Sequence, residues 1–488
     1  MTRDQARRLA GRIFVARFPQ SWKQIDLERF PVANYIVFRD VLGPTFEASR
    51  QRILEAREIL AHHKIDQPVF MMDEEGGRVT QLSAFFEAAP SARAVAKALA
   101  PEAARTLYGY LGAYLARLGI CVNLAPCVDV NTEPLNPIIG TRALGAAPAL
   151  VSVMACKALA AMQPSVSCVA KHFPGHGMTK LDSHLALPVV EEPRERLEHI
   201  HLEPFRAAIR AGVRGIMVSH CLYTSLQQDG LPASLSRAVV TDCLRRDLGF
   251  TGTVITDSLD MRAITETVPS EKAAELALDA GCDLLLYTEI SERFVAAFER
   301  IVDLAVTVPL TEERIRNSVM GKSLAEYCRT FEEVIQAGNR ASLPDEPRRQ
   351  AYLDLAHRVR QEAVKVTKGQ ARLPVSLQEA AIVVAPAALI EKMRPHIRVL
   401  TDASAGGYSA GKPVMLWLME PLVLHRSVAD LRALAASSPL SILVTSYQEL
   451  AEELKDVDVA VVTDDTSPHT EDLIIGKLLG SDPCSRST

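Results

Sequence analysis

Long apolar runs, basic clusters and paired cysteines are all missing from this 488-residue sequence. No apolar stretch approaches the ~18 residues that a membrane-spanning helix needs, which argues against an integral membrane protein. Acidic residues outnumber basic ones by 59 to 54, for a formal net charge of -5, so no electrostatic footprint for nucleic acid or an anionic membrane is present. We therefore expect partners that are neither nucleic acid nor membrane.

The nine cysteines are odd in number and scattered, with no spacing typical of a disulfide framework or a zinc site. Several lie in apolar runs, which favours reduced, buried thiols in a reducing compartment. The apolar patch within the first 20 residues is interrupted by Arg12 and Arg17, which argues against a secretory signal. The expected location is the cytoplasm. With 48% hydrophobic and 23% charged residues, the composition is that of a folded globular protein.

Short apolar runs alternate with longer amphipathic segments up to about residue 305. Continuous apolar strands separated by helices indicate a parallel sheet covered on both faces, and eight such units predict a (β/α)8 TIM barrel. The predicted strands cover residues 11–16, 35–38, 68–72, 121–126, 166–170, 215–220, 253–257 and 282–287. The predicted helices include 45–64, 91–118, 193–211, 236–248, 270–280 and 291–305.

The remainder of the chain predicts a second, smaller domain. A helix over 311–331 is expected to strap the barrel, and a polar stretch followed by a charged helix over 345–368 is typical of a connector. Four further strand candidates alternate with helices, at 381–385, 414–419, 441–444 and 459–463. We predict a barrel domain (1–337), a connector (338–369) and an α/β layered domain (370–488). No glycine-rich phosphate loop follows the first strand of this last domain, which disfavours nucleotide binding.

Polar residues follow the predicted barrel strands at their carboxyl ends, the face on which barrel enzymes carry their chemistry. One aspartate in such a place is as often a helix N-cap as a catalytic residue, but six polar positions on one face are hard to explain by capping alone. They are Asp73, Asp129, Lys171, His172, His220 and Asp257.

Residues 171–184 concentrate the most chemistry, with three histidines, two lysines, an aspartate and two glycines. Proline and glycine break both periodicities here, so a bent or mobile loop is expected. Asp182 and His184 are two residues apart and share one face of an extended segment. A carboxylate beside an imidazole holds its tautomer and favours its protonated form, as a proton shuttle requires. Any one of these histidines alone is more often structural than catalytic.

Five motifs, in this order, resemble glycoside hydrolase family 3, and within it the β-N-acetylglucosaminidases that act on cell-wall fragments. They are Asp-Glu-Glu-Gly-Gly-Arg (73–78), Asn-Pro-Ile-Ile-Gly-Thr-Arg (136–142), Lys-His-Phe-Pro-Gly-His-Gly (171–177), Asp-Ser-His (182–184) and Ile-Thr-Asp-Ser-Leu (255–259). The resemblance covers roughly residues 5–335. The C-terminal part is similar to the family's second domain only in class and position.

The resemblance implies a role for each matching residue. Asp257 matches the nucleophile that forms a covalent glycosyl-enzyme, and His184, oriented by Asp182, matches the acid/base dyad. The residues matching sugar-binding positions are Asp73, Arg142, Lys171 and His172, with Met217 lining the pocket. The implied activity is that of a retaining exo-β-N-acetylglucosaminidase. It would remove terminal GlcNAc from peptidoglycan-derived (anhydro)muropeptides without a cofactor or a metal.

Four alternatives stay open. A phosphorylase is one, because a neutral imidazole base adds no negative charge beside an incoming phosphate. A β-glucosidase of the same family is another, although the complete motif at 182–184 argues against it. A metal-dependent barrel hydrolase would use histidines and carboxylates whose spacing matches no standard pattern: His172, His176, Asp182, His184 and His220. A non-catalytic sugar-binding protein would not need an intact nucleophile and dyad.

Overall fold

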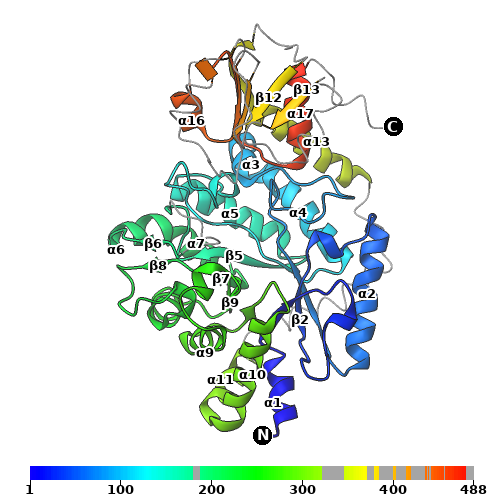
Figure 1. Ribbon diagram of the computed structural model, residues 1–488, viewed down its shortest axis with the longest axis vertical. Coiled ribbons are helices and arrows are strands. Elements are labelled where there is room, and N and C mark those ends of the chain that lie inside the picture. The colour runs from blue at the N-terminus through cyan, green and yellow to red at the C-terminus, as the bar shows by residue number, and fades with distance from the viewer. Residues whose placement is uncertain are drawn as a thin grey trace.

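The computed structural model describes residues 1–179, 187–320, 346–370, 379–383, 399–402, 414–418, 435–436, 438, 441–454 and 457–479. Figure 1 shows a barrel of strands and helices with a smaller sheet domain at one end. Helices α3 (Ala92–Ala98) and α13 (Glu346–Ala363) lie against each other where the two parts meet. The N-terminus lies at the opposite end of the barrel.

Eight parallel strands form the barrel, in the order β10-β1-β2-β3-β4-β5-β7-β9. A bridge between Ile255 and Leu284 joins the last strand of this order to the segment that leads into the first. The predicted (β/α)8 barrel is therefore confirmed. The strands are β1 (Phe14–Arg17), β2 (Asn34–Ile36), β3 (Val69–Met72), β4 (Val122–Asn123), β5 (Ser167–Phe173), β7 (Gly215–Val218), β9 (Thr253–Thr256) and β10 (Leu285–Leu286).

The strands are apolar because helices cover their outer face while side chains fill the interior. All residues of β3, β5, β7 and β9 are buried. Where α10 (Glu292–Thr307) covers β1, aromatic rings supply the packing: Phe14 lies 5.1 Å from Phe298 and 5.7 Å from Phe294 between ring centroids. A short parallel pair, β6 (Val189–Val190) and β8 (Leu222–Tyr223), lies outside the barrel sheet and was not predicted.

One long predicted helix, 91–118, is in fact two helices, α3 and α4 (Pro101–Leu118). Leu99 and Ala100 are extended, and Pro101 starts the second helix, where its missing N–H costs nothing. The other described barrel helices are α1 (Arg3–Ala10), α2 (Phe46–His62), α5 (Pro148–Met162), α6 (Arg194–Arg196), α7 (Glu203–Arg210), α8 (Arg262–Thr265), α9 (Ser270–Ala280) and α11 (Pro309–Met320), with π-helical turns at Leu197–His201 and Ala238–Asp247. Short 3-10 turns occur at Trp22–Gln24, Arg39–Val41, Gly140–Arg142 and Ala233–Leu235. The predicted strap helix lies within the described residues only as far as α11.

The C-terminal sheet has the order β11-β16-β15-β14-β12-β13, parallel except for β11, which is antiparallel to β16. Its strands are β11 (Val364–Lys368), β12 (Glu379–Val383), β13 (Val399–Asp402), β14 (Val414–Leu418), β15 (Ser441–Thr445) and β16 (Val459–Thr463), with helices α16 (Gln448–Glu453) and α17 (Pro468–Leu479). The four predicted strands are present, and β11 and β13 were missed.

The predicted helix over 345–368 was wrong at its end, since α13 stops at Ala363. The next five residues, Val-Lys-Val-Thr-Lys, alternate apolar and polar side chains and pair with β16 as a strand. The division of the chain at 337 and 369 stays a prediction. No described helix is long and apolar enough to cross a bilayer.

Candidate active site

The polar residues predicted at the strand ends gather at the carboxyl end of the barrel. Asp73 follows β3, and Asp257 follows β9. Lys171 and His172 lie within the last three residues of β5. Between residues 170 and 173, β5 advances one residue more than its partner β7, which makes the local irregularity of a β-bulge. Such bulges re-aim consecutive side chains, which strict alternation along a strand would point to opposite faces.

Lys171 is a buried cation held by two carboxylates. Its side chain is 2% exposed, and its Nζ lies 2.5 Å from Asp73 Oδ1 and 2.6 Å from Glu75 Oε1. Burial alone would lower the pKa of this amine, but Asp73 and Glu75 outweigh it and raise the pKa above its ordinary value. Lys171 is therefore charged, and Asp73, with a side chain 21% exposed, is the more accessible of its two partners.

Glu75 joins three segments of the barrel. Arg142 donates from Nε to Oε2 and from Nη2 to Oε1, both at 2.8 Å, while Lys171 contacts Oε1. Burial would raise the pKa of Glu75, but Arg142 and Lys171 outweigh it and hold the pKa well below its usual range. The sequence predicts no role for Glu75 beyond its place in the motif at 73–78. It lies in an irregular turn, where no periodicity tells which way a side chain points.

His172 has its tautomer fixed by its neighbours. Its Nδ1 lies 2.7 Å from Asp129 Oδ2, and its Nε2 lies 3.1 Å from Arg142 Nη2. A guanidinium only donates and a carboxylate only accepts, so Nδ1 carries the proton and Nε2 accepts from Arg142. The His172 ring is consequently held between an anion and a cation.

Asp129 organises the backbone of the motif at 171–177. It is fully buried, and it accepts hydrogen bonds from the backbone N–H of His172 at 3.2 Å and of His176 at 2.6 Å, besides the His172 ring. Burial would raise its pKa, but His172 and His176 outweigh it and lower the pKa to about 2. Asp129 thus holds the backbone of His172 and His176 and the His172 ring in place.

His176 is buried and uncharged. Burial first, and then the neighbouring His172, lower its pKa to about 4. Its Nδ1 lies 2.8 Å from Thr179 Oγ1, and Asn136 donates to the His176 carbonyl at 2.9 Å. The Asn136 Oδ1 in turn accepts from two backbone amides of the loop that leads to Arg142. The Asn136 side chain therefore ties two of the sequence motifs together by hydrogen bonds to their main chains.

Asp257 follows β9 directly and is partly exposed. Its Oδ1 accepts from the Ser258 N–H at 2.7 Å, and its own N–H donates to the Val218 carbonyl at 3.0 Å. His220 donates from Nε2 to the Ser258 carbonyl at 2.8 Å, while Nδ1 contacts Ser234 Oγ at 2.8 Å. His220 therefore steadies the residue that follows Asp257.

Three other predicted site residues are less informative. Met217 is 3% exposed within β7, so its proposed place in a sugar pocket stays a prediction. Asp182 and His184 lie outside the described residues, and their dyad stays a prediction too. Thr179, the described residue before that loop, is buried.

Metal binding at the predicted histidines meets a specific obstacle. Both ring nitrogens of His220 and both of His172 already have protein partners. Cys127, Asp129 and His172 place one donor atom each within 4.8 Å of one another. Asp129 accepts hydrogen bonds from the His172 ring at 2.7 Å and from the Cys127 thiol at 3.2 Å, which accounts for this closeness.

Family comparison agrees with this geometry. A model described as "Glycosyl hydrolase family 3 N terminal domain" matches residues 23–321, more than half of the chain and all of the site residues discussed above. The chain belongs to glycosyl hydrolase family 3. This family 3 chain is 32% identical over 309 residues to a protein of Idiomarina loihiensis named "Beta-hexosaminidase", covering 62% of this chain and 90% of that relative.

Two further family 3 comparisons bear on the rest of the chain. "Beta-hexosaminidase A" of Pseudoalteromonas piscicida is 30% identical over 318 residues, covering 60% of this chain and 53% of that protein. A solved family 3 β-N-acetylglucosaminidase from Paenibacillus sp. superposes with a TM-score of 0.78 at 25% identity. That superposition covers 97% of this chain and 96% of the other, so both parts of the fold are shared.

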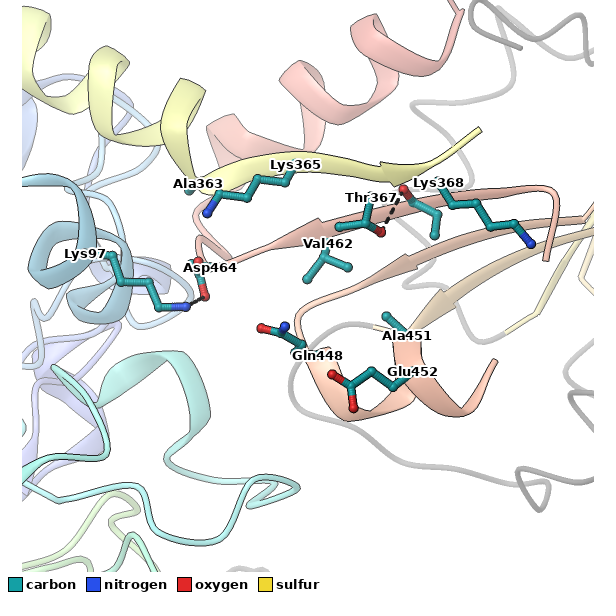
Figure 2. Close-up of a pocket in the computed structure, with 11 residues that line it drawn as sticks. Lys97, Ala363, Lys365, Thr367, Lys368, Gln448, Ala451, Glu452, Val462 and Asp464 are labelled. Carbon is teal, nitrogen blue, oxygen red and sulfur yellow. Dashed lines mark hydrogen bonds and ion pairs between the residues drawn. The ribbon is translucent and has the colours of Figure 1, made fainter. Parts of the chain in front are cut away.

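The cavity drawn in Figure 2 is separate from this family 3 site. Its volume is about 470 Å³, and it lies between α3 and the C-terminal sheet. None of the predicted catalytic or sugar-binding residues lines it. Its charged lining residues are Lys97, Lys365, Lys368, Glu452 and Asp464.

Proposed function

We propose that this family 3 glycoside hydrolase is a retaining exo-β-N-acetylglucosaminidase. Its substrates would be peptidoglycan-derived (anhydro)muropeptide fragments with a terminal GlcNAc. The observation that carries the proposal is the buried charge cluster around Glu75, which lies at the same barrel end as Asp257. The similarity to proteins named beta-hexosaminidase and to a solved β-N-acetylglucosaminidase supports the choice of sugar.

The cluster has donors left for a sugar. Lys171 carries three N–H donors, of which two face Asp73 and Glu75. Arg142 donates from Nε to Glu75 and from Nη2 to both Glu75 and His172. One of its two Nη1 donors binds the Ile138 carbonyl. Within the described part of the chain, each cation thus keeps one donor without an assigned partner. A site of this kind selects hydroxyl-bearing ligands, because an analogue without the hydroxyl leaves buried polar groups unpaired.

The chemistry would proceed in two displacements. Asp257 attacks the anomeric carbon while the His184 imidazolium protonates the leaving oxygen, so the glycosidic bond breaks and a glycosyl ester forms. The neutral His184 ring then takes a proton from water, which attacks the same carbon and releases Asp257. Two inversions give net retention. Asp182 would hold the His184 ring in the required tautomer.

The proposed compartment is the cytoplasm. All seven cysteines in the described part of the chain are free thiols, and six of them are buried, as expected for a reducing compartment. Release of wall fragments and their import would then have to precede this reaction.

The test uses a defined disaccharide, GlcNAc linked β-1,4 to anhydromuramic acid, with and without a stem peptide, in phosphate-free buffer. We expect GlcNAc release from both, with the β-anomer appearing first in the proton NMR spectrum. Initial α-anomer would overturn retention, and no release would overturn the substrate. Formation of GlcNAc 1-phosphate after adding phosphate would make the enzyme a phosphorylase instead.

A further inference from the structure

A loop of the C-terminal domain contacts two segments of the barrel domain beside the charge cluster. This clamp loop, residues 464–467 with the sequence Asp-Asp-Thr-Ser, connects β16 to α17. It contacts two separate barrel segments, the one ending at Ser91 and the turn Gly140–Arg142. Figure 2 shows where the loop begins, with Asp464 paired to Lys97 of α3 at 2.6 Å.

The first arm of the clamp loop is Asp465. Its side chain is fully buried, and Oδ1 accepts from the Ser91 N–H at 2.7 Å. The Ser91 hydroxyl donates back to the Asp464 carbonyl at 2.5 Å. A buried carboxylate needs such partners, because an unpaired one costs far more than a hydrogen bond returns. The segment ending at Ser91 is thereby fixed to the C-terminal domain.

That same segment packs on the turn that carries Glu75. Gly77 donates its N–H to the Ala89 carbonyl at 2.8 Å. Gly76 has a φ of +90°, and a Cβ there would lie 2.5 Å from the Pro90 carbonyl oxygen. Only glycine tolerates this conformation and this closeness. Asp465 is therefore connected to the turn that carries Glu75 through the backbone of residues 89–91.

The second arm of the clamp loop is Thr466. Its Oγ1 lies 2.9 Å from the Oγ1 of Thr141, which is fully buried. Thr141 immediately precedes Arg142 in the turn Gly140–Arg142. Thr466 therefore contacts the residue next to Arg142, which is the ion-pair partner of Glu75.

Helix α13 reinforces the same contact. Arg360, 3% exposed, donates to the Ser467 hydroxyl of the clamp loop at 3.2 Å. Its guanidinium also pairs with Glu87 and donates to the Ala88 carbonyl, both in the segment ending at Ser91. Tyr352 donates to the Glu87 carbonyl at 2.6 Å. Helix α13 thus contacts both the clamp loop and the segment ending at Ser91.

We propose that the clamp loop positions Glu75 and Arg142 for sugar binding, without itself touching the sugar. The C-terminal domain then has a task in substrate affinity, and Asp465 and Thr466 are positioning residues. This proposal rests on the proposed function of the charge cluster. The Idiomarina loihiensis relative aligns with only 62% of this chain over 90% of its own length, so the clamp would be a property of two-domain chains.

The test compares Thr466→Val with the wild type on an aryl N-acetyl-β-glucosaminide. One hydrogen bond is worth about 0.5–1.5 kcal/mol, so KM is expected to rise about 2- to 10-fold, with kcat changed less than about 2-fold. Thr141→Val is also expected to raise KM, and the double variant is expected to raise it by less than the two single effects combined, because both variants remove the same Thr141–Thr466 interaction. Thr466→Ser restores the hydroxyl and is expected to restore KM.

The matched control is Arg93→Met, which removes another interdomain contact, from Arg93 Nη1 to the Ser446 carbonyl at 3.5 Å, outside the clamp loop and the Arg142 turn. It is expected to leave KM unchanged. Melting temperatures check that all variants fold. An unchanged KM in Thr466→Val, or an equal rise in Arg93→Met, would overturn the proposal.

Hydrogen–deuterium exchange separates this proposal from the proposed function. If the wild type cleaves no N-acetylglucosaminide, the proposed function is refuted. The clamp is still tested by the exchange rates of the backbone amides of residues 73–78 and 138–142. Faster exchange of both segments in Thr466→Val than in Arg93→Met is the expected result. Equal exchange in the two variants would overturn the clamp irrespective of activity.

Discussion

Arg142 holds both carboxylate oxygens of Glu75 in a planar fork, with two hydrogen bonds of 2.8 Å. The two residues come from different loops, and Lys171 of β5 contacts the same carboxylate at 2.6 Å. Side-chain exposure is 3% for Glu75 and 10% for Arg142, so water does little to screen the pair. The site is therefore built on a buried ion cluster whose parts cannot be removed singly without cost.

Replacing Glu75 by glutamine should expose that cost. Arg142 and Lys171 would then share a neutral amide that has one acceptor in place of two, so a buried charge loses its partner. We expect the free energy of unfolding to fall by about 3–5 kcal/mol, measured by urea titration at neutral pH. Glu55→Gln, on the exposed face of α2, is the matched control and should change it by less than about 0.5 kcal/mol. A loss in Glu75→Gln no larger than in this control would contradict the cluster's structural weight.

Glu74, the neighbour of Glu75, should give stability a pH dependence of its own. Burial raises its pKa to about 7. The Gln81 N–H, which donates to the Glu74 carboxylate at 2.7 Å, lowers the pKa but is outweighed by burial. A carboxyl whose folded pKa is raised stabilises the fold fully below the unfolded value near 4.5, and this contribution is lost as pH rises through about 7. Glu74→Gln removes the loss.

The measurement for Glu74 is the difference in unfolding free energy between Glu74→Gln and the wild type across pH 4.5–8. It should shift in favour of the variant by roughly 3 kcal/mol as pH rises. Taking the difference cancels the titration of other groups. A difference that stays constant with pH would show that Glu74 ionises normally in the folded protein.

Much of the barrel could be predicted because its strands are continuous apolar runs with polar residues at one end. The eight predicted strands all occur, and the residues that the motifs singled out lie at or just after the ends of β3, β5 and β9. Helix ends were less predictable. Pro101 divides one predicted helix, and residues 364–368 turn from helix to strand because a tertiary partner, β16, is present.

The missing parts of the site share one physical reason. Glu75 owes its role to an irregular turn that Gly76 and Gly77 shape, and Thr466 owes its role to a domain that lies more than 300 residues from Thr141. Neither relation leaves a periodic trace in the sequence. Asp129 was expected at the strand ends, but its three contacts with His172 and His176 depend on the fold of the loop.

Asp129→Asn tests the fixed tautomer of His172. Three N–H groups point at the carboxylate, and an amide nitrogen cannot accept any of them. We expect a loss of about 2–4 kcal/mol in stability and a changed tautomer, read from the ¹⁵N shifts of the His172 ring. Asp66→Asn, exposed before β3, is the control. Unchanged His172 shifts in Asp129→Asn would refute the assigned hydrogen bonds.

The loss of activity on replacing His184 should depend on how strongly the leaving group requires protonation. For His184→Ala we expect kcat/KM to fall on the order of 100-fold or more with a natural disaccharide. The fall should be much smaller with an aryl glycoside whose phenol leaves without protonation. His199→Ala, an exposed histidine, serves as the control. Equal losses on both substrates would argue against His184 as the general acid.

The most direct test of the account is hydrolysis of an aryl N-acetyl-β-glucosaminide beside the matching aryl β-glucoside, in phosphate-free buffer. The wild type should strongly prefer the first, Asp257→Asn should lose on the order of 1,000-fold or more in kcat, and Asp66→Asn should stay active. Preference for the glucoside, silence on both substrates, or an active Asp257→Asn would contradict the account.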